Sequence, residues 1–170
     1  IAPADRDMTY IQLATEVLYF GDIDLAQKIL EKTTTPLLQE EIKAHIARAY
    51  ARKGDCQKAE IFIAAAQGPA LRAKLAEFDP QGRFMIALRT LVEAEALCGR
   101  AEAAEAVGAL YQRAKYREAY QPAVFAAIGM GLQIKGDAPA AERYFSLALT
   151  MARPIQDETI RSTAFSEIGK

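Results

Sequence analysis

The chain has 170 residues, the size of one ordinary domain, with 51% hydrophobic and 25% charged residues. Its abundant Ala, Leu, Glu, Lys and Arg favour helices over strands. A formal net charge of −1 provides no global field to attract nucleic acid, and no apolar run is long enough to span a bilayer. Two cysteines and one histidine argue against a disulfide framework and against a metal site.

A self-similar pattern runs along the chain, centred on four glycines: Gly21, Gly54, Gly99 and Gly136. An aspartate follows three of them, an arginine follows Gly99, and an alanine stands five residues after each: Ala26, Ala59, Ala104 and Ala141. Glycine readily adopts the left-handed backbone that ends a helix, and an aspartate after it can cap the next helix. The pattern therefore predicts helix hairpins that turn at these glycines.

In chain order, the pattern predicts a first unit at about residues 8–34, a second at 37–67, a third at 82–115, a fourth at 120–153 and the start of a fifth at 156–170. An insertion falls at about residues 68–81, where Pro69 could open a short helix through Phe78. The turn glycine of the fifth unit would come after Lys170, so this helix either caps the array or belongs to a longer chain, and we expect the longer chain.

The fourth unit carries the pattern most fully, with Phe125, Gly129, Gly136, Asp137, Ala141, Phe145, Ala148 and Pro154. These columns resemble the tetratricopeptide repeat (TPR), a helix-turn-helix unit of about 34 residues. The third unit departs from that family at Val92, Glu95 and Gly108. The resemblance implies an all-α fold, a right-handed α-solenoid of antiparallel helix hairpins with about four and a half repeats.

His45, Arg48 and Arg52 share one stripe of a predicted helix, at spacings of three and four residues. In the family that this chain resembles, the first helix of each unit lines a concave groove, so the resemblance implies that this stripe faces the groove. The corresponding positions of the next units are Arg89, Glu93, Met130 and Gln133. A basic stripe could bind an acidic peptide or a terminal carboxylate, although it could equally be a solvated polar face. No Lys/Asn set matches the family's carboxylate clamp.

Both cysteines lie beside turn glycines, Cys56 after Gly54 and Cys98 before Gly99. A helix N-terminus can lower the pKa of a thiol, but no histidine stands near either cysteine in sequence to act as a base. We therefore interpret both as small turn residues rather than a chemical site. A disulfide between them is the other interpretation, and it would need an oxidising compartment.

The stretch at residues 111–122 interleaves Tyr111, Tyr116 and Tyr120 with basic residues, a mixture that could stack bases and contact phosphates. The near-neutral charge argues against nucleic acid, so we expect these tyrosines to pack between the third and fourth units. No GxSxG, P-loop, HExxH or GxGxxG motif is present.

The sequence therefore predicts a non-catalytic scaffold or adaptor that binds a protein or peptide and needs no cofactor or metal. A self-association module, a regulatory segment of a larger protein and an RNA-binding helical repeat are the alternatives. Because the chain starts at Ile1 rather than Met, its compartment stays open between the cytoplasm and an exported location.

Overall fold

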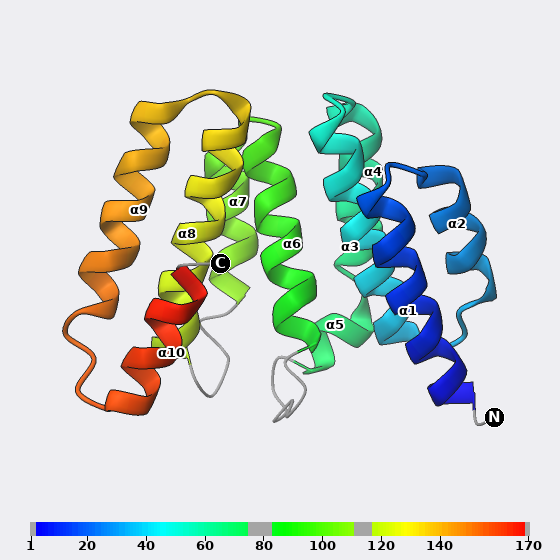
Figure 1. The fold of residues 1–170 in the computed structure, drawn as a ribbon, viewed down its shortest axis with the longest axis horizontal. Coiled ribbons are helices and arrows are strands. Elements are labelled where there is room, and N and C mark those ends of the chain that lie inside the picture. The colour runs from blue at the N-terminus through cyan, green and yellow to red at the C-terminus, as the bar shows by residue number, and fades with distance from the viewer. Residues whose placement is uncertain (1–2, 75–82, 111–116, 169–170) are drawn as a thin grey trace.

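The computed structural model describes residues 3–74, 83–110 and 117–168, and every regular element in these ranges is a helix (Figure 1). The helices are α1 (Pro3–Tyr19), α2 (Ile23–Lys32), α3 (Pro36–Arg52), α4 (Cys56–Ala66), α5 (Pro69–Lys74), α6 (Arg83–Leu97), α7 (Ala101–Gly108), α8 (Arg117–Lys135), α9 (Ala138–Ala152) and α10 (Glu158–Ile168). The all-α class predicted from the sequence is confirmed for the described residues. Tyr111 and Tyr116 lie outside them, as does the side chain of Tyr120.

Four tight turns separate consecutive helices at glycines with positive φ: Gly21 (82°), Gly54 (79°), Gly99 (73°) and Gly136 (96°). The hydrogen bonds are those of a Schellman C-cap. At the first turn, the Gly21 N–H donates to the Leu18 carbonyl at 3.0 Å, and the Asp22 N–H donates to the Val17 carbonyl at 3.0 Å. A side chain other than glycine would be strained in this backbone conformation.

Three of the four helices that follow these turns begin with a side-chain cap from the residue after the glycine. Three aspartates accept a hydrogen bond from the backbone N–H three positions on: Asp22 from Leu25 (3.0 Å), Asp55 from Lys58 (3.1 Å) and Asp137 from Ala140 (3.2 Å). Arg100, which replaces the aspartate before α7, makes no side-chain cap. The four glycine turns define four hairpins, α1–α2, α3–α4, α6–α7 and α8–α9.

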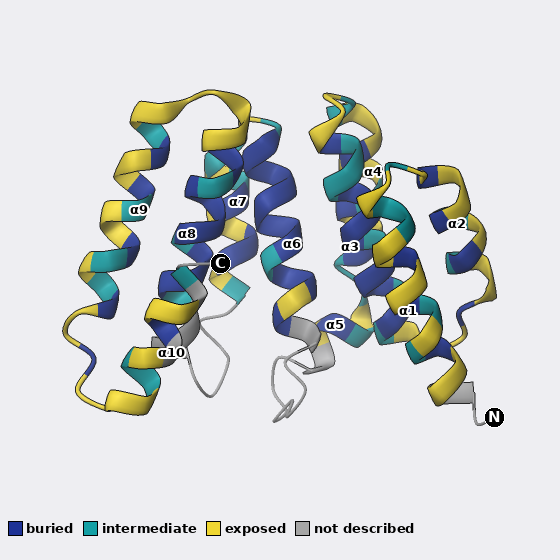
Figure 2. Cartoon of the chain, viewed as in Figure 1, coloured by how far each residue is buried: buried dark blue, intermediate teal, exposed yellow. Residues whose placement is uncertain are grey.

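The first helices of the hairpins contact one another in chain order, α1 with α3, α3 with α6, and α6 with α8, and α10 then contacts α8. Each second helix contacts its own first helix and the first helix of the following unit. Buried residues are concentrated on α3, α6 and α8, whereas α2 and α9 are largely exposed (Figure 2). The first helices therefore form the inner layer of the molecule.

Small residues let α6 and α8 approach closely. A Cβ atom built at Gly131 on α8 would lie 2.6 Å from the Ala96 Cβ and 2.9 Å from the Glu93 carbonyl oxygen on α6. The surrounding core, which includes Leu91 and Ile128, is fully buried and continues from α3 to α9. Glycine at this position therefore sets the distance between α6 and α8, the first helices of the third and fourth hairpins.

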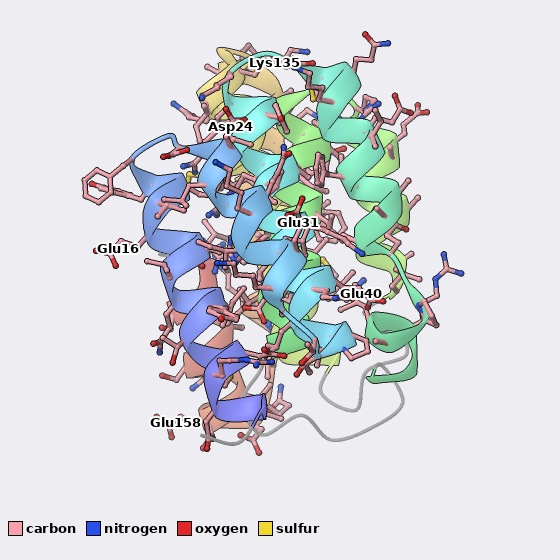
Figure 3. The ribbon with its side chains drawn as sticks, turned by 90° about the vertical axis from the view of Figure 1, so that its right-hand side faces the viewer. Glu16, Asp24, Glu31, Glu40, Lys135 and Glu158 are labelled. Carbon is pink, nitrogen blue, oxygen red and sulfur yellow. A yellow bond between two sulfur atoms is a disulfide. The ribbon has the colours of Figure 1, made fainter. Side chains whose placement is uncertain are left out.

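The insertion begins with α5, which ends at Lys74; Phe78, where the sequence predicted its end, lies outside the described residues. Glu40 on α3 holds the start of α5 by accepting hydrogen bonds from the backbone N–H groups of Ala70, at 3.2 Å, and Leu71 (Figure 3). Gly68 leaves room for this carboxylate, since a Cβ there would lie 2.0 Å from the Glu40 Oε1. The insertion is thus anchored to the second hairpin by a buried acid.

A second buried acid, Asp7 on α1, holds the loop before α3. Its Oδ2 accepts four hydrogen bonds of 2.7–2.8 Å, from the backbone N–H and the hydroxyl of both Thr34 and Thr35. Burial by itself would raise the pKa of Asp7, but these hydrogen bonds outweigh it and hold the pKa well below the usual range. Asp7 therefore fixes the loop that leads into α3, through a charge supplied from another helix.

Replacing Asp7 with Asn is expected to destabilise the fold at about pH 7, because an amide cannot accept four bonds from donors that face the charged form. Because the folded pKa lies below the unfolded value of about 3.9, the contribution of Asp7 is present above that value and is lost as the pH falls below it. The difference in urea midpoint between wild type and Asp7→Asn should therefore shrink near pH 3. Asp5→Asn, on the exposed side of the same helix, is the matched control. A pH-independent difference would contradict this assignment.

Candidate functional site

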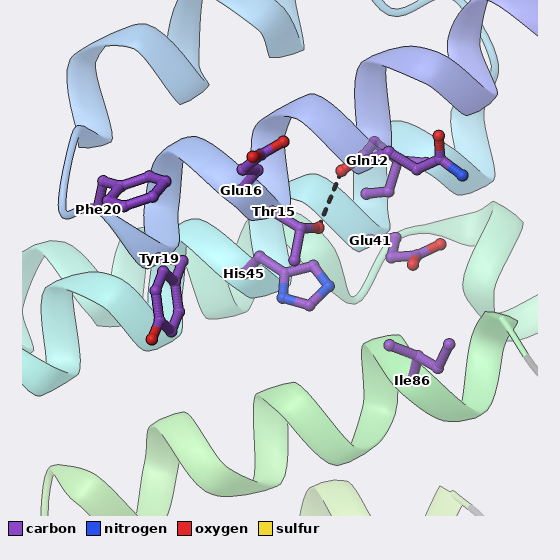
Figure 4. A pocket seen from close by; sticks show the side chains of 9 residues that line it. Gln12, Thr15, Glu16, Tyr19, Phe20, Glu41, His45 and Ile86 are labelled. Atoms are coloured by element: carbon purple, nitrogen blue, oxygen red, sulfur yellow. Dashed lines mark hydrogen bonds between the residues drawn. The ribbon is translucent and has the colours of Figure 1, made fainter.

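An open groove of about 620 Å³ lies between the inner helices α1, α3 and α6 (Figure 4). Nine residues from these helices and the turn after α1 line it: Ile11, Gln12, Thr15, Glu16, Tyr19, Phe20, Glu41, His45 and Ile86. Its volume falls within the range of protein ligand pockets, about 300–1,000 Å³. The groove is the candidate functional site because it combines apolar walls with a few polar groups.

Two aromatic side chains stand at the end of α1, where the helix meets its glycine turn. Tyr19 is 86% exposed and Phe20 is 77% exposed, and their rings meet edge to face with centroids 5.5 Å apart. The left-handed Gly21 ends the helix at this point, so the two rings project beyond the hairpin instead of packing inside it. Exposed neighbouring aromatics are typical of protein-binding surfaces rather than of ordinary solvated helix ends.

The groove floor is formed by α3, through Glu41 and His45, which lie one helical turn apart and are both buried. Burial chiefly, and the neighbouring Arg48 charge in addition, lower the pKa of His45 to about 3. The Nδ1 of His45 lies 3.3 Å from the Arg48 Nη2, and it accepts this contact because a guanidinium only donates. His45 is therefore a neutral group at physiological pH.

Arg48 and Arg52, which the sequence assigned to a basic stripe, both contact Glu93 on the next inner helix. The Arg48 Nη1 lies 3.2 Å from the Glu93 Oε2, and the Arg52 Nη2 lies 2.7 Å from the Glu93 Oε1. Glu93 is buried, whereas the Arg52 side chain is about half exposed. The two arginines thus serve to join α3 to α6, and one carboxylate already offsets part of their charge.

The other predicted binding residues lie elsewhere on the inner helices. Arg89 is half-buried and makes interactions within the chain, Met130 is half-buried, and Gln133 is exposed near the end of α8. Of the seven residues that the sequence assigned to partner binding, only His45 lines the groove between α1, α3 and α6. The candidate site therefore lies nearer the first hairpin than the sequence predicted, because most of the residues that line the groove belong to α1 and the turn after it.

Three residues of the groove that were not predicted from the sequence, Gln12, Thr15 and Tyr19, have a recognisable position relative to their turn glycine. His45, Arg48 and Arg52 stand nine, six and two residues before their turn glycine, and the same offsets before Gly21 give Gln12, Thr15 and Tyr19. These three equivalent residues all line the groove. Applying the same offsets to the first unit would have predicted the α1 wall of the groove. No local pattern in the sequence identifies Ile86 on the opposite helix, α6.

A second hollow of about 430 Å³ lies between the first two turns, lined by Gly21, Asp22, Ile23, Asp24, Tyr50, Lys53, Asp55 and Lys58. Its cations already have partners. The Lys58 Nζ lies 3.2 Å from the Asp55 Oδ2, and the Lys53 Nζ donates to the Gly21 carbonyl at 2.9 Å. This hollow therefore joins neighbouring turns rather than presenting unsatisfied groups to a ligand.

Cys56 and Cys98 form a disulfide, with Cα atoms 5.6 Å apart. Their interpretation as small turn residues without a covalent role is therefore wrong, and the alternative that the sequence left open is the one observed. The pairing follows from the fold, because the start of α4 and the end of α6 meet where consecutive turns stack. The disulfide joins the second hairpin to the third.

Within the described ranges, no group of three or more His, Cys, Asp and Glu side chains is placed to hold a metal ion. None of the helices that the structure describes is both long and apolar enough to cross a membrane. No family model, curated protein or solved structure matches the chain. A functional assignment therefore depends on the groove and its surroundings.

Proposed function

We propose that this chain is a TPR-like solenoid that binds a polypeptide segment of another protein in the groove between α1, α3 and α6. It would act as a non-catalytic scaffold or adaptor. The observation that carries the proposal is the exposed pair of Tyr19 and Phe20 beside a groove whose other walls include Ile11 and Ile86. The series of glycine-turn hairpins, whose first helices stack in order, supports the architectural part.

A polypeptide suits this groove better than a small molecule does. The groove is open to solvent along inner helices that are already packed, so little ordering of the chain itself would oppose association. Tyrosine and phenylalanine bury large areas with few rotatable bonds, which makes them effective anchors for a partner's apolar side chain. Binding would therefore centre on the end of α1.

Self-association is the second candidate, and the same observation favours it. The two exposed rings of one copy could enter the apolar groove of another, in a head-to-tail arrangement. Sedimentation across a range of concentrations distinguishes the two candidates. A mass that rises with concentration and returns to that of one chain in Tyr19→Ala/Phe20→Ala would favour self-association.

The main test is a selection of short random peptides displayed on phage and enriched on the wild-type chain alone. The recovered peptides are then compared on the wild type and on Tyr19→Ala/Phe20→Ala. We expect the recovered peptides, made synthetically, to bind the double variant about tenfold or more weakly, because it lacks the anchoring rings. The matched control is Ile61→Ala, which removes another exposed apolar side chain, outside the groove. Circular dichroism should show equal helicity for all three. Peptides that bind wild type and double variant equally would contradict the proposal.

A further inference from the structure

The groove lining includes two carboxylate side chains, which are the groups there that can carry a charge at neutral pH. Glu16 lies on α1 at the rim and Glu41 lies on α3 at the floor (Figure 4). His45 between them is uncharged at neutral pH, because burial and Arg48 lower its pKa to about 3. The nearest arginines on α3 are held at Glu93 and do not line the groove. At its α1 rim a ligand therefore meets the negative charge of Glu16, whereas the arginines of the basic stripe expected from the sequence do not line the groove.

The two carboxylates differ in what they could offer a ligand. Glu41 is buried and already interacts within the chain. Glu16 is exposed and makes no ion pair or side-chain hydrogen bond with any residue that the structure describes. It stands three and four residues before Tyr19 and Phe20, so all three side chains emerge on neighbouring parts of one helix surface. Glu16 is the carboxylate that can pair with an incoming charge.

Carboxylate and aromatic ring together are complementary to one kind of side chain. A guanidinium or ammonium group is attracted to the face of a tyrosine or phenylalanine ring, and a carboxylate pairs with the same cation. Arginine suits such a site best, because its planar group can stack on a ring while donating to a carboxylate. The methylene stem of Arg or Lys can at the same time cover apolar surface.

We propose that the groove selects a polypeptide segment in which an apolar residue is accompanied by an arginine or lysine, with the cation placed between Glu16 and the Tyr19–Phe20 pair. The apolar side chain lies against Ile11 and Ile86 in the groove. This inference rests on the proposed function and adds the charge of the partner. It replaces the acidic partner expected from the sequence with a basic one.

The test uses groove-binding peptides from the selection described above, each made in three forms with Arg, Gln or Glu at the charged position. We expect the order Arg, Gln, Glu for wild-type affinity, with the Arg preference decreasing at high salt. Glu16→Lys should weaken the Arg peptide by about fivefold, the upper range for an exposed ion pair, and strengthen the Glu peptide. Glu31→Lys is the matched control, since it makes the same charge change at an exposed site on α2, outside the groove.

The outcomes separate the two proposals. Peptides that need Tyr19 and Phe20 but bind equally in all three forms, or best as Glu, overturn the basic-partner inference and leave the groove as a binding site. Equal effects of Glu16→Lys and Glu31→Lys also overturn it, because they reduce the preference to net charge. Peptides that bind Tyr19→Ala/Phe20→Ala as tightly as the wild type overturn both the proposal that the groove binds peptides and the basic-partner inference that rests on it.

Discussion

Removing the Cys56–Cys98 disulfide is expected to lower the free energy of unfolding by about 4 kcal/mol. The two cysteines are 42 residues apart in sequence, and closing a loop of that length restricts the unfolded chain by about this amount in the chain-entropy treatment. The bond also spans the junction between the second and third hairpins, where the Arg100 Nη1 lies 3.0 Å from the Glu60 Oε2. This ion pair is partly exposed and contributes much less than the covalent link.

The measurement is urea unfolding of the wild type and of Cys56→Ala/Cys98→Ala, each with and without reductant. Reductant should shift the wild-type midpoint toward that of the double variant and should leave the variant unchanged. Thiol counting by mass spectrometry shows whether the bond was present and was reduced. A wild type that loses the disulfide without a change in midpoint would show that the link adds nothing to stability.

The disulfide also bears on the groove. Its walls come from α1, α3 and α6, and the disulfide holds the end of α6 to the hairpin that contains α3. The Arg48 and Arg52 contacts to Glu93 join the same two helices. Covalent and ionic links at one junction therefore keep the opposing walls of the groove at a fixed separation. Such preorganisation favours binding, since less freedom is lost when a partner enters.

Local chemistry explains why the turns could be predicted from the sequence. A left-handed backbone requires glycine, and a helix start favours an aspartate that accepts backbone N–H groups, so Gly54 followed by Asp55 determines a turn within a few residues. The repetition of the pair along the chain then indicates hairpins. The same reasoning places the start of α5 at Pro69, because proline suits the first turn of a helix.

The candidate site could be predicted only in part, because its features depend on contacts between hairpins. Nothing near Arg48 in the sequence indicates that Glu93, 45 residues away, will pair with it. The burial of His45 likewise depends on α1 and α6 closing over α3. The role of Asp7 follows from its approach to two threonines 27 and 28 residues further along the chain. A single helix pattern indicates which residues share a face, but not which face another hairpin covers.

Gly131→Leu is expected to destabilise the protein by about 3 kcal/mol, near the upper end for overpacking a core. Besides the Ala96 Cβ and the Glu93 carbonyl, a Cβ at this position would approach the Leu97 backbone nitrogen at 3.0 Å. Two of these three atoms belong to the backbone of α6, so no side-chain rotation relieves the clash and the helices must separate. Leucine favours the helix over glycine by about 0.8 kcal/mol, which offsets only part of the destabilisation from overpacking.

Gln133→Leu is the matched control, because it places the same side chain on the same helix at an exposed position. Thermal and urea unfolding should show a large loss for Gly131→Leu and a change of less than about 0.5 kcal/mol for the control. If the two variants unfolded together, the close approach of α6 and α8 would not be required.

The separation of α6 from α8 in Gly131→Leu has a second consequence, because Glu93 lies on the displaced helix α6. Gly131→Leu should therefore loosen the contact of Glu93 with Arg48 and Arg52, and weaken peptide binding in a groove that Gly131 does not line.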